Sequence, residues 1–222
     1  SMAKGAGMLA PGMATMLCVV TTDAALDPAQ ADGALKEAVR TTLNRLDADG
    51  CMSTNDTVVL MASGASGVSP EPAAFQEALT AVCHDLAQQL LTDAEGAEHD
   101  VAITVVNATT EDAAEAVARA VARSNLFKAA IFGRDPNWGR IISAAGTVPE
   151  AVAPFDATLI DVYFNGVQVC RAAGVGEPRE LVDLAPRAVD VVIDLHAGGA
   201  TATVWTNDLT HDYVHENSAY SS

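Results

Sequence analysis

A threonine that follows a run of small residues is the first candidate for chemistry in this sequence. Thr15 comes after residues 4–14, which are rich in glycine, alanine and proline. It precedes an apolar, β-branched segment, residues 17–22, whose composition predicts a buried strand. Cleavage of the Ala14–Thr15 peptide bond would free an α-amine beside the threonine hydroxyl, giving a base and a nucleophile in one residue. The alternative interpretation is an ordinary loop that ends in a threonine.

A longer stretch around Thr15 resembles the self-cleavage region of the ornithine acetyltransferases, also called glutamate N-acetyltransferases. It reads Lys-Gly-Ala-Gly-Met-Leu-Ala-Pro at residues 4–11 and Met-Ala-Thr-Met-Leu at residues 13–17. The resemblance extends to residue 222 and includes Ser-Thr-Asn-Asp-Thr at residues 53–57 and Asp-Pro-Asn-Trp-Gly-Arg at residues 135–140. It implies that Ala14–Thr15 is the cleavage site and that Thr15 is the catalytic nucleophile.

The resemblance implies an acyltransferase of arginine biosynthesis. Such an enzyme moves an acetyl group from N2-acetyl-L-ornithine to L-glutamate through an acetyl ester of Thr15. No metal and no redox cofactor are implied, and acetyl-CoA stays open as a second acetyl donor. Substrate contacts are implied for Lys4, Thr15, Glu95, Asn217 and Ser222. From composition alone, Lys4 would be a solvated loop lysine and Glu95 an acid at a helix end.

The resemblance also implies a partner chain. In the family, the residues before the cleavage site form an α chain, the residues after it form a β chain, and two of each assemble as an α2β2 heterotetramer. Residues 1–14 would then be the end of the α chain, and the oxyanion hole would lie in the segment before residue 1. We expect the chain to be a weak catalyst without that segment, since one oxyanion-hole donor contributes roughly 10²–10³ in rate.

Two other functions agree with the same residues. A self-processing aminopeptidase or amidohydrolase of the same superfold would pass the acyl group to water, although those peptidases typically use a serine. A non-catalytic fragment that binds amino acids would carry Thr15 without using it. The Ala-Thr junction and the Asp-Pro-Asn-Trp-Gly-Arg segment favour the transferase.

Composition restricts the partners and the compartment. The chain has 29 acidic and 12 basic residues and a formal net charge of −17, which disfavours nucleic acid and anionic membranes as partners. There is no apolar run long enough to span a membrane and no signal-peptide pattern. The cysteines form no CxxC pair and predict buried free thiols in a reducing compartment, the cytoplasm. They are Cys18, Cys51, Cys83 and Cys170.

The elements that must position these residues alternate between helix and strand through most of the chain. Hydrophobic periodicity predicts strands at residues 17–22, 58–64 and 101–106, the first two of them buried. It predicts helices at residues 28–46, 73–91 and 110–124. Residues 125–132 are expected to be extended, and a short helix is expected at residues 141–145. This alternation predicts layered α/β structure.

The pattern becomes β-rich after residue 157. It predicts a hairpin over residues 159–170 with an Asn-Gly turn, and a strand at residues 189–195 paired antiparallel with residues 200–206. With the resemblance, we expect an α/β fold of the αββα self-processing, N-terminal-nucleophile-like type with a mainly antiparallel C-terminal part. The expected parts are residues 1–14, 15–150 and 151–222. His211 and His215 have a zinc-binding spacing, but without a third ligand no metal site is expected.

Overall fold

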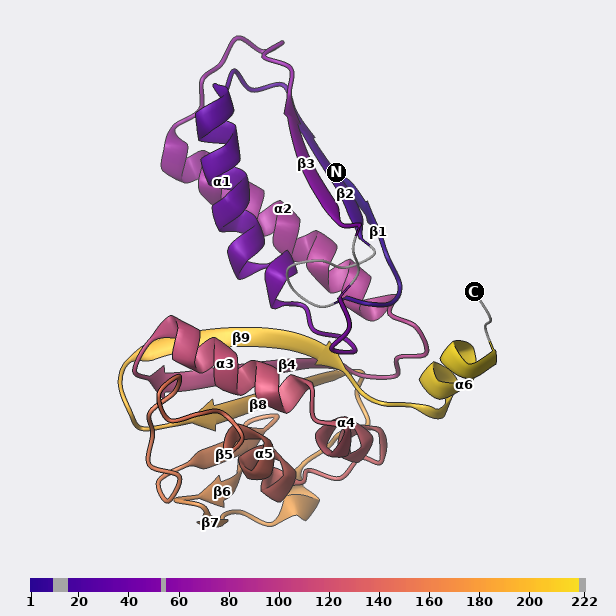
Figure 1. The fold of residues 1–222 in the computed structure, drawn as a ribbon, viewed down its shortest axis with the longest axis vertical. Coiled ribbons are helices and arrows are strands. Elements are labelled where there is room, and N and C mark those ends of the chain that lie inside the picture. Colours follow the sequence, from indigo (N-terminus) through magenta and orange to yellow (C-terminus); the bar gives the residue numbers. More distant parts are fainter. Residues whose placement is uncertain (10–15, 53–54, 220–222) are drawn as a thin grey trace. The chain divides into compact units, whose positions relative to one another are not determined.

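The computed structural model describes residues 1–9, 16–52 and 55–219, which form two compact units, Ser1–Ala94 and Glu95–Ser222. Each unit contains one sheet with helices, which confirms the mixed α/β class (Figure 1). The observed division at residue 94 differs from the expected division at residue 150, because strands before and after residue 150 share one sheet. Among the described residues, no helix has both the length and the apolar character needed to cross a lipid bilayer.

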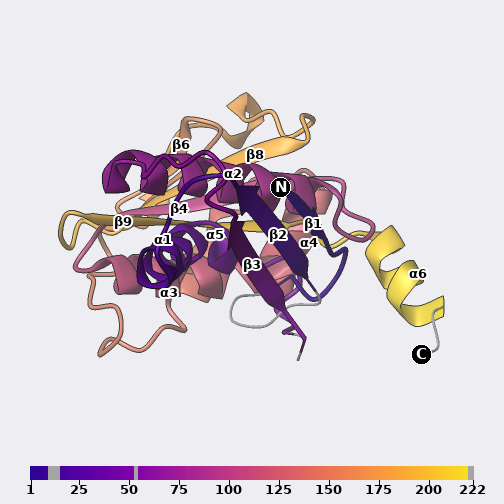
Figure 2. The same ribbon diagram turned by 90° about the horizontal axis from the view of Figure 1, so that it is seen from above.

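The first unit is built on a three-stranded sheet. Its strands are β1 (Met2–Lys4), β2 (Leu17–Thr22) and β3 (Thr57–Ala62), in that order across the sheet (Figure 2). β2 is antiparallel to β1 and parallel to β3. The helices α1 (Pro28–Thr41) and α2 (Pro72–Thr92) pack against each other on one face of the sheet.

The strands β2 and β3, predicted to be buried, are covered on only one face within this unit. In β2, Cys18 and Val20 are buried while Leu17 is exposed, and in β3 Val59 and Met61 are exposed. Successive side chains of a strand point to opposite faces of the sheet. Helices cover only one of those faces within this unit, so every second apolar residue of these strands faces outward.

The first helix is shorter than expected. It begins as predicted at Pro28, after Asp27, whose carboxylate accepts hydrogen bonds from the backbone at Ala29 and Gln30, both at 2.9 Å. It ends at Thr41, and a 3-10 turn, η1 (Leu43–Arg45), follows. The helical pattern predicted a helix to residue 46, because a 3-10 turn keeps buried apolar residues at nearly the same spacing.

The second unit contains a six-stranded sheet in the order β7-β6-β5-β8-β4-β9. Most of its strand pairs are antiparallel, which confirms the expected character of the C-terminal part. The helices α3 and α5 pack together, and α3 lies against β4 and β9 (Figure 1). The strands are β4 (Asp100–Ala108), β5 (Asp161–Phe164), β6 (Val167–Arg171), β7 (Gly174–Val175), β8 (Ala188–Asp194) and β9 (Ala200–Asn207). The helical segments are α3 (Glu111–Ala122), α4 (Asn125–Phe132), α5 (Trp138–Ala145), η2 (Arg179–Leu181) and α6 (His211–Ala219).

The predicted antiparallel pairing of residues 189–195 with residues 200–206 is wrong. β4 lies between β8 and β9, parallel to the first and antiparallel to the second. Ile103 and Val105 of β4 are fully buried, so this strand takes the position between two neighbours. The connection from β8 to β9 crosses the end of β4, where Ala197 N and Gly198 N donate to Asn107 O at 2.7 and 2.8 Å.

Two local predictions in the second unit have opposite outcomes. The hairpin is confirmed, and Asn165 and Gly166 both have positive φ angles, 46° and 82°, as a two-residue turn with this sequence requires. The extended conformation predicted for residues 125–132 is wrong, because these residues form α4. Phe127 and Ile131 are four residues apart and both buried, so the apolar run packs as a helix.

Three of the four cysteines are buried free thiols, as predicted, but Cys51 is exposed. Cys51 lies in the connection before β3, outside the packed core. Burial, with a smaller contribution from Cys18, raises the pKa of the Cys83 thiol from 9.0 to about 11. Since the folded state favours the neutral thiol, this contribution to stability is present below pH 9 and is lost as the pH rises towards 11.

Candidate functional site

Residues just before the proposed cleavage site form hydrogen bonds with the segment that connects η1 to β3. Ala14 and Thr15 themselves lie outside the described residues. Ahead of them, Met8 N donates to the Asp49 carboxylate at 2.9 Å, and Leu9 O accepts from Ala48 N at 2.7 Å. The side chain of Leu9 is 1% exposed. The turn at residues 47–50 therefore anchors the chain before the site.

The residue just after the proposed cleavage site, Met16, forms hydrogen bonds with the end of the same connecting segment and the start of β3. Met16 N donates to Asp56 Oδ1 at 2.8 Å, and Met16 O accepts from Thr57 N at 3.0 Å. Met16 is buried. Short polar side chains such as those at residues 53–57 commonly tie a bend to backbone groups, and the Asp56 carboxylate does so here.

Lys4 lies on β1, directly opposite Leu17 at the start of β2. Its side chain is exposed, and no carboxylate in the described part of the chain pairs with it. An unpaired ammonium group can bind a carboxylate of an amino-acid substrate. The antiparallel pairing of β1 with β2 thus places Lys4 opposite Leu17, which is the second residue after Thr15 in the sequence.

Glu95 and Asn217 come together in the second unit although they are 122 residues apart. Asn217 Nδ2 donates to Glu95 Oε2 at 3.2 Å and to Tyr213 O at 3.0 Å. No lysine or arginine among the described residues neutralises Glu95, so its carboxylate is available to a cationic ligand. Sequence alone assigned both residues to one site through the resemblance, and the structure brings these two side chains together.

The C-terminal helix α6 is anchored on Gly96. Thr210 Oγ1 donates to Gly96 O at 2.6 Å and accepts from Tyr213 N at 2.9 Å. Gly96 has a φ of 63°, and a Cβ at this position would lie 2.3 Å from Tyr213 N. Only glycine fits both this conformation and this close approach. Sequence reasoning did not single out this glycine.

We expect Gly96→Ala to detach α6 and to destabilise the chain by about 1–3 kcal/mol, since the added Cβ meets backbone rather than a movable side chain. Limited proteolysis with mass spectrometry should show faster release of the C-terminal tail. Gly33→Ala is the matched control, because nothing lies within 4 Å of a Cβ there. A tail as resistant in Gly96→Ala as in Gly33→Ala would contradict this prediction.

A buried carboxylate holds the start of β4 to the end of β9. Asp208 Oδ1 accepts from Glu98 N and His99 N, each at 3.0 Å, and Asp208 Oδ2 lies 2.7 Å from His99 Nδ1. The other ring nitrogen of His99 lies 3.1 Å from Leu184 O. Both side chains are almost fully buried. This network joins the chain that follows Glu95 to the chain that precedes Asn217.

The tryptophan of the Asp-Pro-Asn-Trp-Gly-Arg segment could either line a pocket or pack against the core. Trp138 is partly buried against the core of the second unit. Asn137 caps α5 by accepting from Arg140 N at 3.2 Å, and its amide donates to Asp135 at 2.9 Å. These contacts favour the structural role, because the polar side chains are used by the turn and the helix cap.

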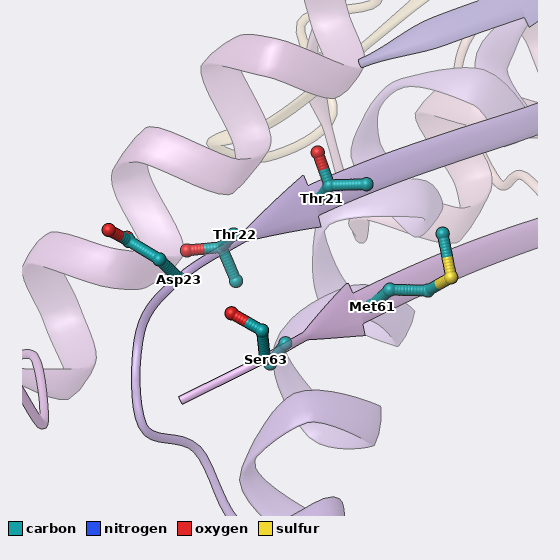
Figure 3. A pocket seen from close by; sticks show the side chains of 6 residues that line it. Thr21, Thr22, Asp23, Met61 and Ser63 are labelled. Carbon is teal, nitrogen blue, oxygen red and sulfur yellow. The ribbon is translucent and has the colours of Figure 1, made fainter. Parts of the chain in front are cut away.

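Two further features have no part in the predicted site. No cluster of three metal-binding side chains occurs among residues 1–9, 16–52 and 55–219, and His211 instead lies edge-on to Phe132, with 5.3 Å between ring centroids. A pocket of about 590 Å³ lies at the carboxyl ends of β2 and β3, and Figure 3 shows side chains that line it. It is lined by Thr21, Thr22, Asp23, Met61, Ala62 and Ser63. Lys4 and Met16 lie at the opposite ends of these strands.

Comparison with known proteins identifies the family. The family model described as ArgJ family matches residues 1–222. The chain belongs to the ArgJ family. The proteins of Streptomyces coelicolor and Mycobacterium leprae, each named arginine biosynthesis bifunctional protein ArgJ, are 62% and 52% identical to it. Both alignments include 100% of this chain but only 57% and 54% of those proteins, so this ArgJ chain spans little more than half their length.

A solved ArgJ structure has the same fold. The crystal structure of arginine biosynthesis bifunctional protein ArgJ from Bacillus halodurans matches with a TM-score of 0.87 and 37% sequence identity. The match covers 93% of this ArgJ chain and 100% of the solved chain. The family resemblance found in the sequence is therefore confirmed by relatives and by fold.

The site residues assigned through the resemblance fall into three groups in this ArgJ chain. Ala14, Thr15 and Ser222 lie outside the described residues. Lys4 belongs to the first unit, and Glu95 and Asn217 belong to the second. Their roles toward a substrate stay predictions. Sequence reasoning missed the contacts of Asp49 and Asp208 with backbone amides, because local patterns do not show which distant amides these carboxylates bind.

Proposed function

We propose that this ArgJ chain carries the nucleophile of an enzyme that transfers an acetyl group from N2-acetyl-L-ornithine to L-glutamate. Thr15 becomes the nucleophile when the Ala14–Thr15 bond is cleaved. The observation that carries the proposal is the ArgJ family match over residues 1–222, which includes the segment around Ala14–Thr15. Relatives over 50% identical and named for arginine biosynthesis support the pathway.

We propose that the residues upstream of Thr15 belong to a partner α chain and that two α and two β chains assemble as α2β2. The relatives extend beyond this chain, since the alignments include only 57% and 54% of the Streptomyces coelicolor and Mycobacterium leprae proteins.

The proposed reaction proceeds in two balanced half-reactions. The Thr15 hydroxyl attacks the acetyl carbonyl of N-acetylornithine, and the Thr15 α-amine accepts the hydroxyl proton and delivers it to the leaving ornithine amine. The α-amine of glutamate then attacks the acetyl ester, and the Thr15 hydroxyl is restored. No cofactor is consumed in either step, and acetyl-CoA would be an alternative donor.

The remaining residues would bind the substrates. The Glu95 carboxylate accepts from Asn217 and has no cationic partner among the described residues, so it suits the ammonium group of ornithine. The Lys4 ammonium has no acidic partner in the same described part of the chain and suits a substrate carboxylate. Ser222 is proposed as a further contact from the tail. The buried free thiols suit a reducing compartment, so we propose the cytoplasm as the site of the reaction.

Intact-mass spectrometry of the full-length precursor tests the proposal. We expect two chains, the second of which begins at Thr15. The purified product should convert N-acetylornithine and glutamate to ornithine and N-acetylglutamate. Release of acetate at the same rate with and without glutamate would favour a hydrolase, and a precursor that stays intact would contradict the self-cleaving enzyme.

A further inference from the structure

Asp56 has a contact that the proposed reaction does not use. Its carboxylate accepts from Met16 N at 2.8 Å across 40 residues of sequence. Met16 N is the nitrogen of the Thr15–Met16 peptide bond, and the C–N bond length of about 1.33 Å ties it to the Thr15 carbonyl carbon. A group that fixes Met16 N therefore limits where the backbone of the nucleophile can be.

We propose that Asp56 is a positioning residue for self-cleavage at Ala14–Thr15. The inference rests on the proposed function. It assigns to Asp56 the task of orienting the backbone that carries the attacking hydroxyl, and no proton transfer or direct contact with the reacting atoms.

The pairing of β2 with β3 explains why a side chain is needed at this point. The parallel ladder begins at Leu17, which is opposite Thr57. One residue earlier, Thr57 N reaches Met16 O at 3.0 Å, whereas Met16 N is bound by the Asp56 side chain. The carboxylate thus takes the place of a strand acceptor for Met16 N. Together with the Thr57 amide, which binds Met16 O, it keeps both polar backbone groups of Met16 in register with β3.

The charge of Asp56 strengthens this contact. Asp56 is half-buried, and no lysine, arginine or histidine in the described part of the chain pairs with it. Hydrogen bonds to a carboxylate are shorter and stronger than those between neutral groups. Since Met16 is itself 7% exposed, water has little access to compete for its amide.

Asp49 provides a matched comparison. It binds Met8 N at 2.9 Å, so it is also a carboxylate on a backbone amide beside the same segment. Met8, however, is six residues before Ala14, whereas Met16 follows Thr15 directly. If the substitutions acted only through overall stability, Asp49→Ala and Asp56→Ala would slow cleavage to a similar extent. If Asp56 positions the backbone of Thr15, cleavage slows mainly in Asp56→Ala.

The test follows self-cleavage of the full-length precursor over time by electrophoresis and mass spectrometry, alongside thermal unfolding. We expect Asp56→Ala to slow cleavage at least about 10-fold, since a misplacement of about 1 Å can cost that much or more. Asp56→Asn keeps an acceptor oxygen and should restore cleavage to within about 3-fold of the unchanged precursor. Asp49→Ala also removes an anchor of this segment, but at Met8 rather than at Met16, so it should slow cleavage clearly less than Asp56→Ala does.

Three outcomes would overturn the inference: unchanged cleavage in Asp56→Ala, equal slowing in Asp49→Ala, or no recovery in Asp56→Asn. Slowing that only parallels a lower melting temperature across the variants would also overturn it. The unchanged precursor separates this inference from the proposed function. If the unchanged precursor is not cleaved, the proposed function is wrong. If the unchanged precursor and Asp56→Ala are both cleaved rapidly, only the positioning role of Asp56 is wrong.

Discussion

Thr15→Ala will leave the full-length precursor uncut and will lower acetyl transfer by at least about 10⁴-fold, the scale seen when an enzyme loses its nucleophile. The substitution removes the hydroxyl that attacks in cleavage and in transfer. Mass spectrometry of the purified protein and a coupled assay of ornithine release measure the two effects separately.

Thr15→Ser is the matched control, because serine keeps a hydroxyl on the same carbon. We expect this variant to be cleaved and to transfer acetyl at a reduced but measurable rate. If Thr15→Ala instead matures and transfers acetyl normally, the mechanism through an acetyl-threonine ester is wrong. Blocking the free α-amine of the cleaved protein should likewise stop turnover, since that amine is the proposed base.

Asp208→Ala will lower the free energy of unfolding of the second unit by about 3–5 kcal/mol, the cost typical of breaking a buried polar pair from one side. Its carboxylate serves two backbone amides and the ring of His99. All three donors would lose their partner in a site that water does not reach.

Urea unfolding of the chain followed by tryptophan fluorescence measures this loss, because both tryptophans, Trp138 and Trp205, lie in the second unit. Asp212→Ala, in the exposed first turn of α6, is the control and should change the free energy by less than about 0.5 kcal/mol. Equal urea midpoints for the two variants would show that the Asp208 network does not stabilise the unit.

The sequence by itself determined those features that depend on neighbouring residues. Asp27-Pro28 predicts a helix start because an acceptor before a proline caps the free backbone amides there. The Asn-Gly turn predicts its hairpin because both residues must adopt positive φ. The candidate site residues were predicted from the family resemblance, because a self-cleaving nucleophile needs a specific cleavage junction and specific flanking segments.

Only the tertiary structure decided which distant segments pair. The strand next to β9 proved to be β4, because burial of Ile103 and Val105 favours a central position that alternation of apolar residues does not specify. Other contacts also join residues far apart in sequence. They are the hydrogen bonds of Asp49, Asp56 and the buried Asp208 to backbone amides, and the close approach of Gly96 to the backbone of Tyr213. Such contacts depend on the path of the backbone in space, which local patterns of residue type do not fix.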